Sequence, residues 1–323
     1  MVDISSIIVN WNTRDLLLQT IVSLKDQATR FSTEIIVVDN GSTDGSQAAT
    51  AAAFPDVAVI DTGANLGFSR ANNIGICRAR GRYICLVNSD TKALPGSIDA
   101  MGAYMESHPE CGILGPKTLN GDMSLRVNCR TFPTLWNLLC GAFCLHRLFP
   151  RSRILGENLM RHFGHDIVRD VDILPGCFLM IRREALDAVG LLDERFFIYG
   201  EDKDLCRRFR DAGWKVTFCP DAKVIHYAKG SSSKAPARFL VEKLRANRQY
   251  WEKHHGAAGA FFFVLVMLLH HLLRLPGGAL RLLGGQAARE AARRRIGASL
   301  RCIRWLLARL AGKDLPLGAQ DTP

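Results

Sequence analysis

The chain has 323 residues, of which 48% are hydrophobic and 23% charged, which is typical of a folded protein with an ample core and excludes an intrinsically disordered one. Its formal net charge of +11 is concentrated at one end: residues 238–323 contain 15 Lys or Arg and 5 Asp or Glu, whereas residues 1–237 contain 27 and 26. The ten cysteines form no Cys-x-x-Cys pair, so we expect free thiols in a reducing cytoplasm and neither a disulfide framework nor a structural zinc site. The N-terminal residues lack a basic segment before a long apolar run, which argues against a signal peptide.

Three short apolar runs near the N-terminus are predicted to be strands, at residues 4–9, 34–38 and 83–87. A helical spacing of apolar residues begins at about residue 14, just after the first run. Because strands and helices alternate, the sequence predicts an α/β fold with a doubly wound, Rossmann-like sheet.

The second and third runs each end at a polar turn that contains an aspartate, Asp39 in one and Asp90 in the other. Ligands of open α/β sheets bind beyond the carboxyl ends of the strands, so we expect Asp39 and Asp90 to lie on one edge of the sheet. Taken singly, each aspartate is better interpreted as a turn residue or a helix cap.

A polar segment rich in small residues, 65–75, lies between the second and third predicted strands. It suits a loop that enters a helix close to a ligand, where Arg70 would bind a phosphate with both branches of its guanidinium group. The alternative for Arg70 is an ordinary surface arginine at the start of a helix.

An acidic cluster that begins with Glu201 and Asp202 separates an apolar run from a predicted helix. The spacing of Leu205 and Phe209 predicts that helix, and Gly213 predicts its end. Carboxylates are favoured at a helix N-terminus, so an N-cap is the simpler interpretation. Proton abstraction also requires such a carboxylate, and the cluster becomes a catalytic candidate if partners lie nearby.

Five polar blocks follow one another along the chain: Val9-Asn10-Trp11-Asn12, Asp39-Asn40-Gly41-Ser42, Asn65-Leu66-Gly67-Phe68, Asn88-Ser89-Asp90 and residues 199–206. Together they resemble the inverting family 2 glycosyltransferases with the GT-A fold, within the bacterial rhamnosyltransferase-like branch of surface polysaccharide assembly. The resemblance covers about residues 4–230. Five blocks in order are far more specific than any one of them.

The resemblance implies a role for each block. Asp39 would bind the nucleotide base, within a nucleotide-binding set of Val9, Trp11, Asp39, Asn40, Asn65, Arg70 and Asp90. The family's Asp-x-Asp motif, which holds a divalent metal such as Mg²⁺ or Mn²⁺ against the diphosphate, reads Asn88-Ser89-Asp90 here and so lacks its first carboxylate. His226, which alone would be a strand-end residue, would complete the metal site. Asp202 would be the catalytic base, with Glu201 beside it.

The implied reaction is a single displacement that inverts the anomeric carbon, with Asp202 taking the proton of the acceptor hydroxyl. The donor would be a dTDP- or UDP-sugar, with rhamnose a candidate sugar, and the acceptor a glycan or a lipid-linked molecule. The alternative class is a catalytically silent nucleotide-sugar-binding or membrane scaffold protein.

The sequence predicts two domains, a catalytic one at residues 1–237 and a basic, apolar, helical tail at residues 238–323. Residues 257–273 are at the short limit for crossing a bilayer, and the leucines and arginines that follow form an amphipathic pattern. We expect the tail to hold the protein, as a peripheral or monotopic protein, on the anionic inner face of the bacterial cell membrane. The alternative is a solvated helix pair that packs on the catalytic domain or in an oligomer. Nucleic acid is not an expected partner, because no reader motif accompanies the charge.

Overall fold

The computed structural model describes residues 2–149, 151–152, 154–155, 159–227 and 236–313. The chain divides into two compact units, which we call unit 1 (Met1–Phe132 and Leu159–Ser233) and unit 2 (Pro133–Asn158 and Lys234–Pro323). The chain therefore crosses between the units three times. The predicted domains differ from this division in placing residues 133–158 with the catalytic domain.

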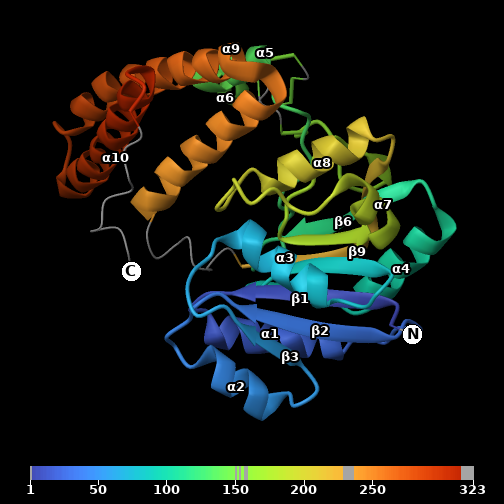
Figure 1. The fold of residues 1–323 in the computed structure, drawn as a ribbon. Coiled ribbons are helices and arrows are strands. Elements are labelled where there is room, and N and C mark those ends of the chain that lie inside the picture. The colour runs from blue at the N-terminus through green and yellow to red at the C-terminus, as the bar shows by residue number, and fades with distance from the viewer. Residues whose placement is uncertain (1, 150, 153, 156–158, 228–235, 314–323) are drawn as a thin grey trace. The chain divides into compact units, whose positions relative to one another are not determined.

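Unit 1 is built on a nine-stranded sheet with the order β3-β2-β1-β4-β8-β6-β9-β5, in which β7 pairs with β9 (Figure 1). The first four strands of this order run parallel, as the alternating pattern predicts, whereas β8 is antiparallel to both of its neighbours and makes the sheet mixed. The strands are β1 (Ile4–Asn10), β2 (Thr33–Asp39), β3 (Ala58–Asp61), β4 (Tyr83–Asn88), β5 (Thr91–Ala93), β6 (Cys111–Leu119), β7 (Arg169–Asp170), β8 (Phe178–Arg182) and β9 (Lys215–His226).

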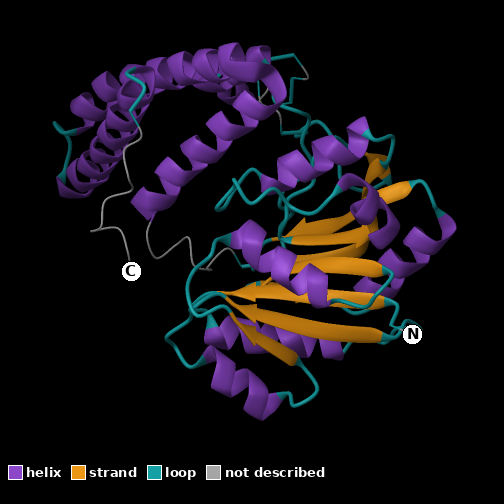
Figure 2. Ribbon diagram, viewed as in Figure 1, coloured by secondary structure: helices purple, strands orange, loops and turns teal. Residues whose placement is uncertain are grey.

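Helices cover both faces of this sheet, which confirms the predicted α/β class (Figure 2). Successive side chains of a strand point to opposite faces, so Ile7 and Leu86 enter one core, with α3, α7 and α8, and Ile8 and Val87 enter the other, with α1 and α4. All ten cysteines lie in described residues and are free, as predicted. The helices of unit 1 are α1 (Arg14–Lys25), α2 (Ser46–Ala53), α3 (Phe68–Arg78), α4 (Ser97–Ser107), α7 (Arg183–Val189) and α8 (Glu201–Asp211).

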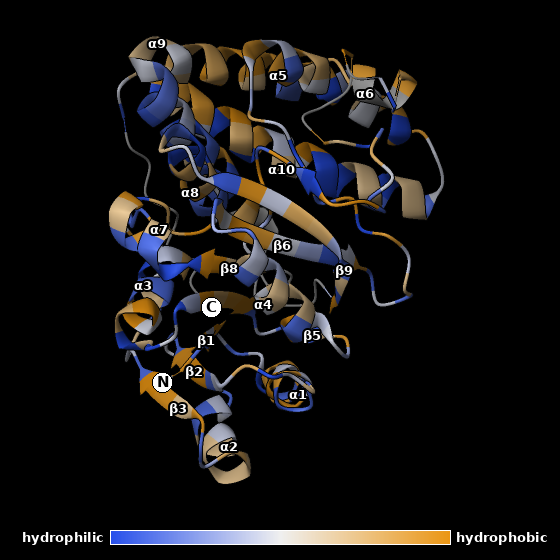
Figure 3. Cartoon of the chain, turned by 90° about the vertical axis from the view of Figure 1, so that its right-hand side faces the viewer, coloured by the Kyte–Doolittle hydropathy of each residue, from blue (hydrophilic) through white to orange (hydrophobic). Residues whose placement is uncertain are grey.

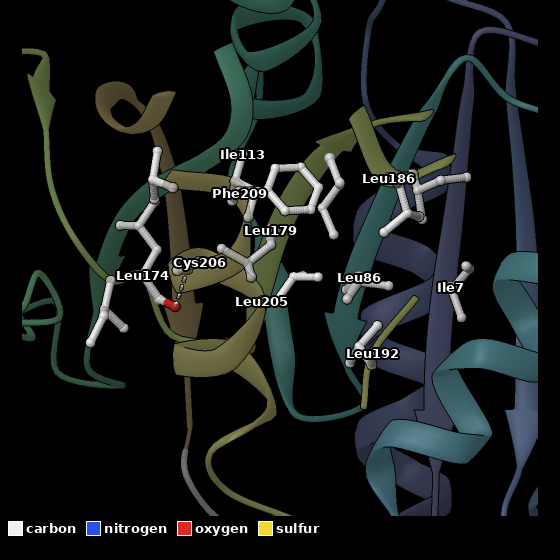
Figure 4. Packing of buried hydrophobic residues seen from close by; sticks show 14 of the residues in the cluster. Ile7, Leu86, Ile113, Leu174, Leu179, Leu186, Leu192, Leu205, Cys206 and Phe209 are labelled. Carbon is white, nitrogen blue, oxygen red and sulfur yellow. Dashed lines mark hydrogen bonds between the residues drawn. The ribbon is translucent and has the colours of Figure 1, made fainter. Parts of the chain in front are cut away.

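Helix α8 is held on the sheet by the apolar residues that predicted it. Leu205 and Phe209 are buried in the core cluster drawn in Figure 4. The helix ends before Gly213, whose positive φ of 87° is the conformation that glycine adopts readily at a helix end. This packing fixes the first turn of α8, which carries Glu201 and Asp202.

The described residues of unit 2 form four helices: α5 (Leu135–Ala142), α6 (Leu145–Leu148), α9 (Pro236–Arg281) and α10 (Gln286–Leu310). Helices α9 and α10 pack along each other, and α5 packs on α9, where His270 Nδ1 lies 3.0 Å from the Ala142 carbonyl oxygen. Gly256 interrupts α9 with non-helical φ and ψ of 70° and −175°, directly before the apolar stretch at residues 257–273. The stretch is therefore a helical segment of its own.

Unit 2 exposes large apolar side chains in α9, in α10 and in residues 133–158. Among the described helices, one is long and apolar enough to cross a membrane by length and composition, over Phe239–Arg281, and only 28% of its most apolar window is buried. Figure 3 shows the hydrophobic stretches along α9. The exposed large apolar residues include Phe261, Phe262, Leu265, Leu269, Leu272 and Leu273 in α9, and Trp136, Phe143, Leu148, Phe149 and Ile154 in residues 133–158.

Candidate active site

Three neighbouring parallel strands of unit 1 end at one edge of the sheet with polar residues. Asn10 of β1 is in register with Asp39 of β2, and Val9 of β1 is in register with Asn88 of β4. Asp90 follows Asn88 after one residue, so the expected common edge for Asp39 and Asp90 is confirmed.

Asp39 is fully buried and held in one orientation. Its carboxylate accepts hydrogen bonds from the Asn10 side chain at 2.9 Å, from the Ser42 N–H at 2.8 Å and from the Gln47 side chain at 3.1 Å. An ionised carboxylate has about four acceptor positions, so the three donors leave one of them open.

A chain of hydrogen bonds, which the sequence analysis missed, joins Asp39 to the end of β4. Asn10 binds Asp39 with its side-chain N–H and accepts a hydrogen bond from Thr13 Oγ1 at 2.7 Å with its oxygen. Thr13 Oγ1 in turn lies 2.7 Å from Ser89 Oγ. Asn10 and Ser89 belong to two of the five polar blocks, and this was the feature of the sequence that could have identified them as site residues.

The other residues predicted near the base occupy different environments. The Val9 side chain packs in the core, so only its main chain can face a nucleotide, whereas Trp11 is partly exposed just beyond β1. Asn40 donates from its side chain to Asn65 Oδ1 at 3.0 Å and accepts from the Leu66 N–H at 2.9 Å. These bonds hold the loop around Asn65 against the end of β2.

The same loop contacts the segment that leads into α8. The Phe68 N–H donates to the Phe197 carbonyl oxygen at 2.6 Å, and a Cβ atom at Gly67 would lie 2.7 Å from that oxygen. Gly67 also has a φ of 88°, so this close approach requires glycine. Arg70 lies on α3 with an exposed side chain, and its Nε is 3.8 Å from Glu194 Oε2, a surface ion pair.

Asp202 is connected to the end of β4 through two consecutive residues. The Gly176 N–H donates to Asp202 Oδ2 at 3.3 Å, and the carbonyl oxygen of Cys177 accepts from the Asn88 N–H at 2.9 Å. These two bonds bring the candidate base near the end of β4, which carries the candidate metal ligands.

Glu201 differs from its neighbour because it is buried, with a relative exposure of 5%. Burial and the negative charge of Asp202 raise the pKa of Glu201 to about 8, which makes the neutral acid its main form at pH 7. Its Oε2 has no hydrogen-bond partner among the described residues. The residue before the helix is Gly200, which has no side chain to cap it, but Asp202 Oδ1 accepts a hydrogen bond from the Lys203 N–H at 2.8 Å, so Asp202 satisfies one N–H group of the first turn.

Asp204, the third carboxylate of the cluster, has a structural role. It is fully buried, and Arg208 Nε donates to it at 2.8 Å. The same guanidinium group donates to the carbonyl oxygens of residues 189–191. The pair therefore ties α8 to the end of α7.

The end of β4 suits a divalent cation. Asn88 Oδ1 is buried without a hydrogen-bond partner among the described residues, and such an oxygen costs about 1–3 kcal/mol that a cation would relieve. Asp90, two residues on, is 5% exposed. No group of three or more His, Cys, Asp or Glu that could hold a metal occurs in the described residues, so oxygens of the substrate and water would complete the site.

His226 lies between Asp90 and Arg126. Its Nε2 is 3.1 Å from Asp90 Oδ1, and its Nδ1 is 3.1 Å from Arg126 Nη1. Burial favours the neutral ring, but hydrogen bonds with Asp90 and Cys177 outweigh it and raise the pKa of His226 to about 10. The Arg126 guanidinium group faces the ring from the other side, so His226 lies between an acidic and a basic side chain.

The chain belongs to glycosyl transferase family 2, whose sequence model matches residues 5–190. It is a glycosyltransferase of this family, and the blocks that end at Asn88-Ser89-Asp90 lie inside the matched range. Asp202 and His226 lie beyond it.

Two relatives and two solved structures extend this finding. The N-acetylglucosaminyl-diphospho-decaprenol L-rhamnosyltransferase of Mycobacterium tuberculosis (strain H37Rv) is 32% identical over 229 residues, which cover 66% of this chain and 73% of the relative. The low-salt glycan biosynthesis hexosyltransferase Agl10 of Haloferax volcanii is 27% identical, over 69% of this chain and 67% of the relative.

The structures are the mannosyltransferase PcManGT of Pyrobaculum calidifontis in complex with GDP-Man and Mn²⁺, and GalNAc-T7 with UDP, GalNAc and Mn²⁺. The first has a TM-score of 0.57 at 15% identity and covers 96% of this chain and 88% of its own. The second has a TM-score of 0.55 at 15% identity and covers 79% of this chain and 51% of its own. The likeness shows the fold, a GT-A-like mixed sheet.

Proposed function

We propose that this glycosyltransferase moves a sugar, with rhamnose the first candidate, from a dTDP- or UDP-sugar to a lipid-linked or glycan acceptor with inversion, in cell-surface polysaccharide synthesis. The observation that carries the proposal is the link through Gly176 and Cys177, which puts the Asp202 carboxylate beside the strand end that carries Asn88. The name of the Mycobacterium tuberculosis relative supports both rhamnose and a lipid-diphosphate acceptor.

In this mechanism Asp202 accepts the proton of the acceptor hydroxyl as its oxygen attacks the anomeric carbon. The new carbon–oxygen bond forms on the face opposite the breaking bond to phosphate, and the nucleoside diphosphate departs with that bond's electrons. Asp39 and Asn40 hold the nucleoside, because Asp39 is fixed by three donors and Asn40 secures the neighbouring loop. Glu201, as a neutral acid, adds no second negative charge beside the diphosphate.

Asn88 and Asp90 would hold the divalent cation against the diphosphate. A bound Mg²⁺ or Mn²⁺ would supply positive charge that offsets the charge of the leaving group. In the absence of nucleotide, the oxygens of these two residues are too few for full coordination, so we expect metal and nucleoside diphosphate to bind together.

We further propose that unit 2 holds the protein on the inner face of the cell membrane, as a peripheral or monotopic protein. The exposed apolar residues of α9 and of residues 133–158 support burial in lipid, and the arginines of α10 support attraction to anionic headgroups at about 1 kcal/mol each. A lipid-linked acceptor would then be presented to the enzyme in two dimensions.

The test is nucleoside diphosphate release by the full-length protein, measured across several nucleotide sugars with Mg²⁺, Mn²⁺ or chelator and a lipid-diphosphate acceptor. Asp202→Asn should abolish transfer and leave nucleotide-sugar binding nearly intact, because the amide keeps the shape and loses the basicity. Glu201→Gln should lower the rate of transfer less than Asp202→Asn does. Turnover by Asp202→Asn would remove Asp202 from this role. Binding without turnover of any donor would instead favour the silent nucleotide-sugar-binding or scaffold protein.

A further inference from the structure

The edge of the sheet that carries the candidate site continues beyond β4. In the sheet order the strands β8, β6 and β9 follow β4, and β6 and β9 run in the same direction as β2, β1 and β4. The carboxyl ends of all five parallel strands therefore lie at one edge. Asp39 is at one end of this row and His226, the last residue of β9, is at the other, with the end of β4 between them.

Arg126 lies at the far end of this row, in the turn that follows β6. Its backbone N–H donates to the Thr118 carbonyl oxygen at 3.0 Å, and its Nε donates to Asn120 Oδ1 at 2.8 Å. Its Nη1 is 3.1 Å from His226 Nδ1. These contacts, with β6, with the turn after it and with β9, hold the guanidinium group in one position at the edge of the sheet.

The positive charge of Arg126 has no counterpart in the part of the chain that the structure describes. A guanidinium group stays protonated in proteins, and the side-chain partners of Arg126 are an amide oxygen and an imidazole ring. It forms no ion pair with a described carboxylate, and its Nη2 has no hydrogen bond to a described residue. Asp122, in the same turn, instead accepts a hydrogen bond from the Ser124 N–H at 3.0 Å. A guanidinium group held in this way is suited to the oxygens of a phosphate group.

The position of Arg126 along the edge determines which phosphate group it can contact. In the proposed reaction the nucleoside lies at Asp39 and the donor diphosphate at the end of β4. Asp202 is bound by Gly176, two residues before β8, and β8 is the strand next to β4 in the sheet order. The acceptor hydroxyl at Asp202 then lies beyond the donor diphosphate in this order, and inversion requires it to attack from the face opposite that diphosphate. The rest of the acceptor extends toward β6 and β9, where Arg126 lies.

We propose that Arg126 binds the diphosphate of a lipid-linked acceptor and so selects acceptors that carry a diphosphate next to the reacting sugar. The inference rests on the proposed function, because it takes the nucleotide to bind at Asp39 and Asp202 to be the base. The N–H groups of Nη2, with the N–H of Nη1 that does not face His226, donate to the phosphate oxygens. Within the proposed function, this narrows the acceptor to a lipid diphosphate.

The experiment compares two acceptors with the full-length protein in detergent micelles. One is N-acetylglucosamine joined to farnesol through a diphosphate, and the other is N-acetylglucosamine joined to farnesol directly. Initial rates of nucleoside diphosphate release, at a saturating concentration of the nucleotide sugar that gives turnover, yield kcat and KM for each acceptor. In the wild-type protein the acceptor with the diphosphate should have a KM that is lower by about 10- to 100-fold, since hydrogen bonds to charged groups are among the strong ones.

Substitution of Arg126 should affect one acceptor and spare the other. Arg126→Gln should raise the KM of the diphosphate acceptor by about 10- to 100-fold and leave that of the direct glycoside unchanged, so the glycoside reports on folding. Arg126→Lys, which keeps the charge and loses the planar fork, should lie in between. Arg78→Gln, which removes the same charge at an exposed position of α3, should change neither KM. Equal losses with the two acceptors in Arg126→Gln would show a structural role and overturn the inference.

Binding measurements separate the donor diphosphate from the acceptor diphosphate. The affinity of Arg126→Gln for UDP or dTDP with Mg²⁺, measured by titration calorimetry, should equal that of the wild-type protein. A loss there of about 10-fold or more would assign Arg126 to the donor, and would overturn the inference while the proposed function stands.

The same calorimetry tests Arg126 independently of turnover. Absence of turnover by the wild-type protein with both acceptors would count against the proposed function. Farnesyl diphosphate in the same micelles would then be the probe, and weaker binding by Arg126→Gln than by Arg78→Gln would support the role of Arg126. Equal binding of farnesyl diphosphate by the two variants would overturn it.

Discussion

The burial of Glu201 predicts an unusual dependence of stability on pH. Burial and the neighbouring charge of Asp202 raise its pKa from 4.5 to about 8 in the folded chain, which corresponds to as much as about 5 kcal/mol. Below pH 4.5 the carboxyl is protonated in both folded and unfolded chains, so its contribution is fully present. Between pH 4.5 and 8 the unfolded chain releases the proton and the folded chain keeps it, so folding loses stability as the pH rises.

Glu201→Gln tests this reasoning, because glutamine keeps the shape and has no proton to lose. The free energy of unfolding of the variant, relative to that of the wild-type protein, should rise by up to about 5 kcal/mol between pH 4.5 and pH 8. Urea unfolding at pH 5 to 8.5 measures it, with Glu184→Gln, at an exposed position of α7, as the control that should show no such trend. A difference between Glu201→Gln and the wild-type protein that stays constant with pH would refute the buried neutral acid.

Three other perturbations have expected outcomes. Arg208→Met removes the charged partner of the buried Asp204 and should lower the free energy of unfolding by about 3–5 kcal/mol. Arg207→Met, which breaks an exposed pair, should cost about 1 kcal/mol or less. Equal losses in urea unfolding would show that burial of Asp204 is not what matters. Gly67→Ala should lower stability and nucleotide affinity more than Gly63→Ala, because both glycines have positive φ but only Gly67 lies against Phe197. Equal nucleotide affinities of the two variants, measured by calorimetry, would contradict the role of this contact. High salt should release only part of the wild-type protein from anionic vesicles. The double variant Phe261→Ser, Phe262→Ser should be released to a larger extent. Full release of the wild-type protein would mean that charge alone attaches it to the vesicles.

The parts of the fold that the sequence predicts are those with a repeating pattern. The first three predicted strands agree with β1, β2 and β4 to within one residue at either end, because their apolar runs stop at polar turns. The antiparallel insertion of β8 between β4 and β6 has no such signal, since strand direction depends on partners far along the chain. The membership of residues 133–158 in unit 2 was missed for the same reason.

In the candidate site, too, local features can be predicted from the sequence, whereas contacts between distant residues cannot. Aspartates at strand ends can be read from sequence, and so could the pairing of Asp204 with Arg208, four residues apart on one helix face. The hydrogen bonds that join Asp39, Asn10 and Thr13 cannot be predicted from the sequence, because these residues meet only when neighbouring strands are in register. The contrast between Glu201 and Asp202 also depends on depth in the fold, which a pair of adjacent acids does not reveal.

The path of the chain between the units has a consequence for protein engineering. The chain leaves unit 1 after Phe132 and returns at Leu159, and these two crossings are adjacent, since the Met160 N–H donates to the Cys129 carbonyl oxygen at 3.0 Å. A truncation near residue 237 would therefore keep α5 while removing its partner α9, and so leave apolar surface without cover. Excision of both segments, with a short loop joining Phe132 to Leu159, would remove unit 2 as one cassette. The corresponding unit of a related enzyme could be joined at the same boundaries.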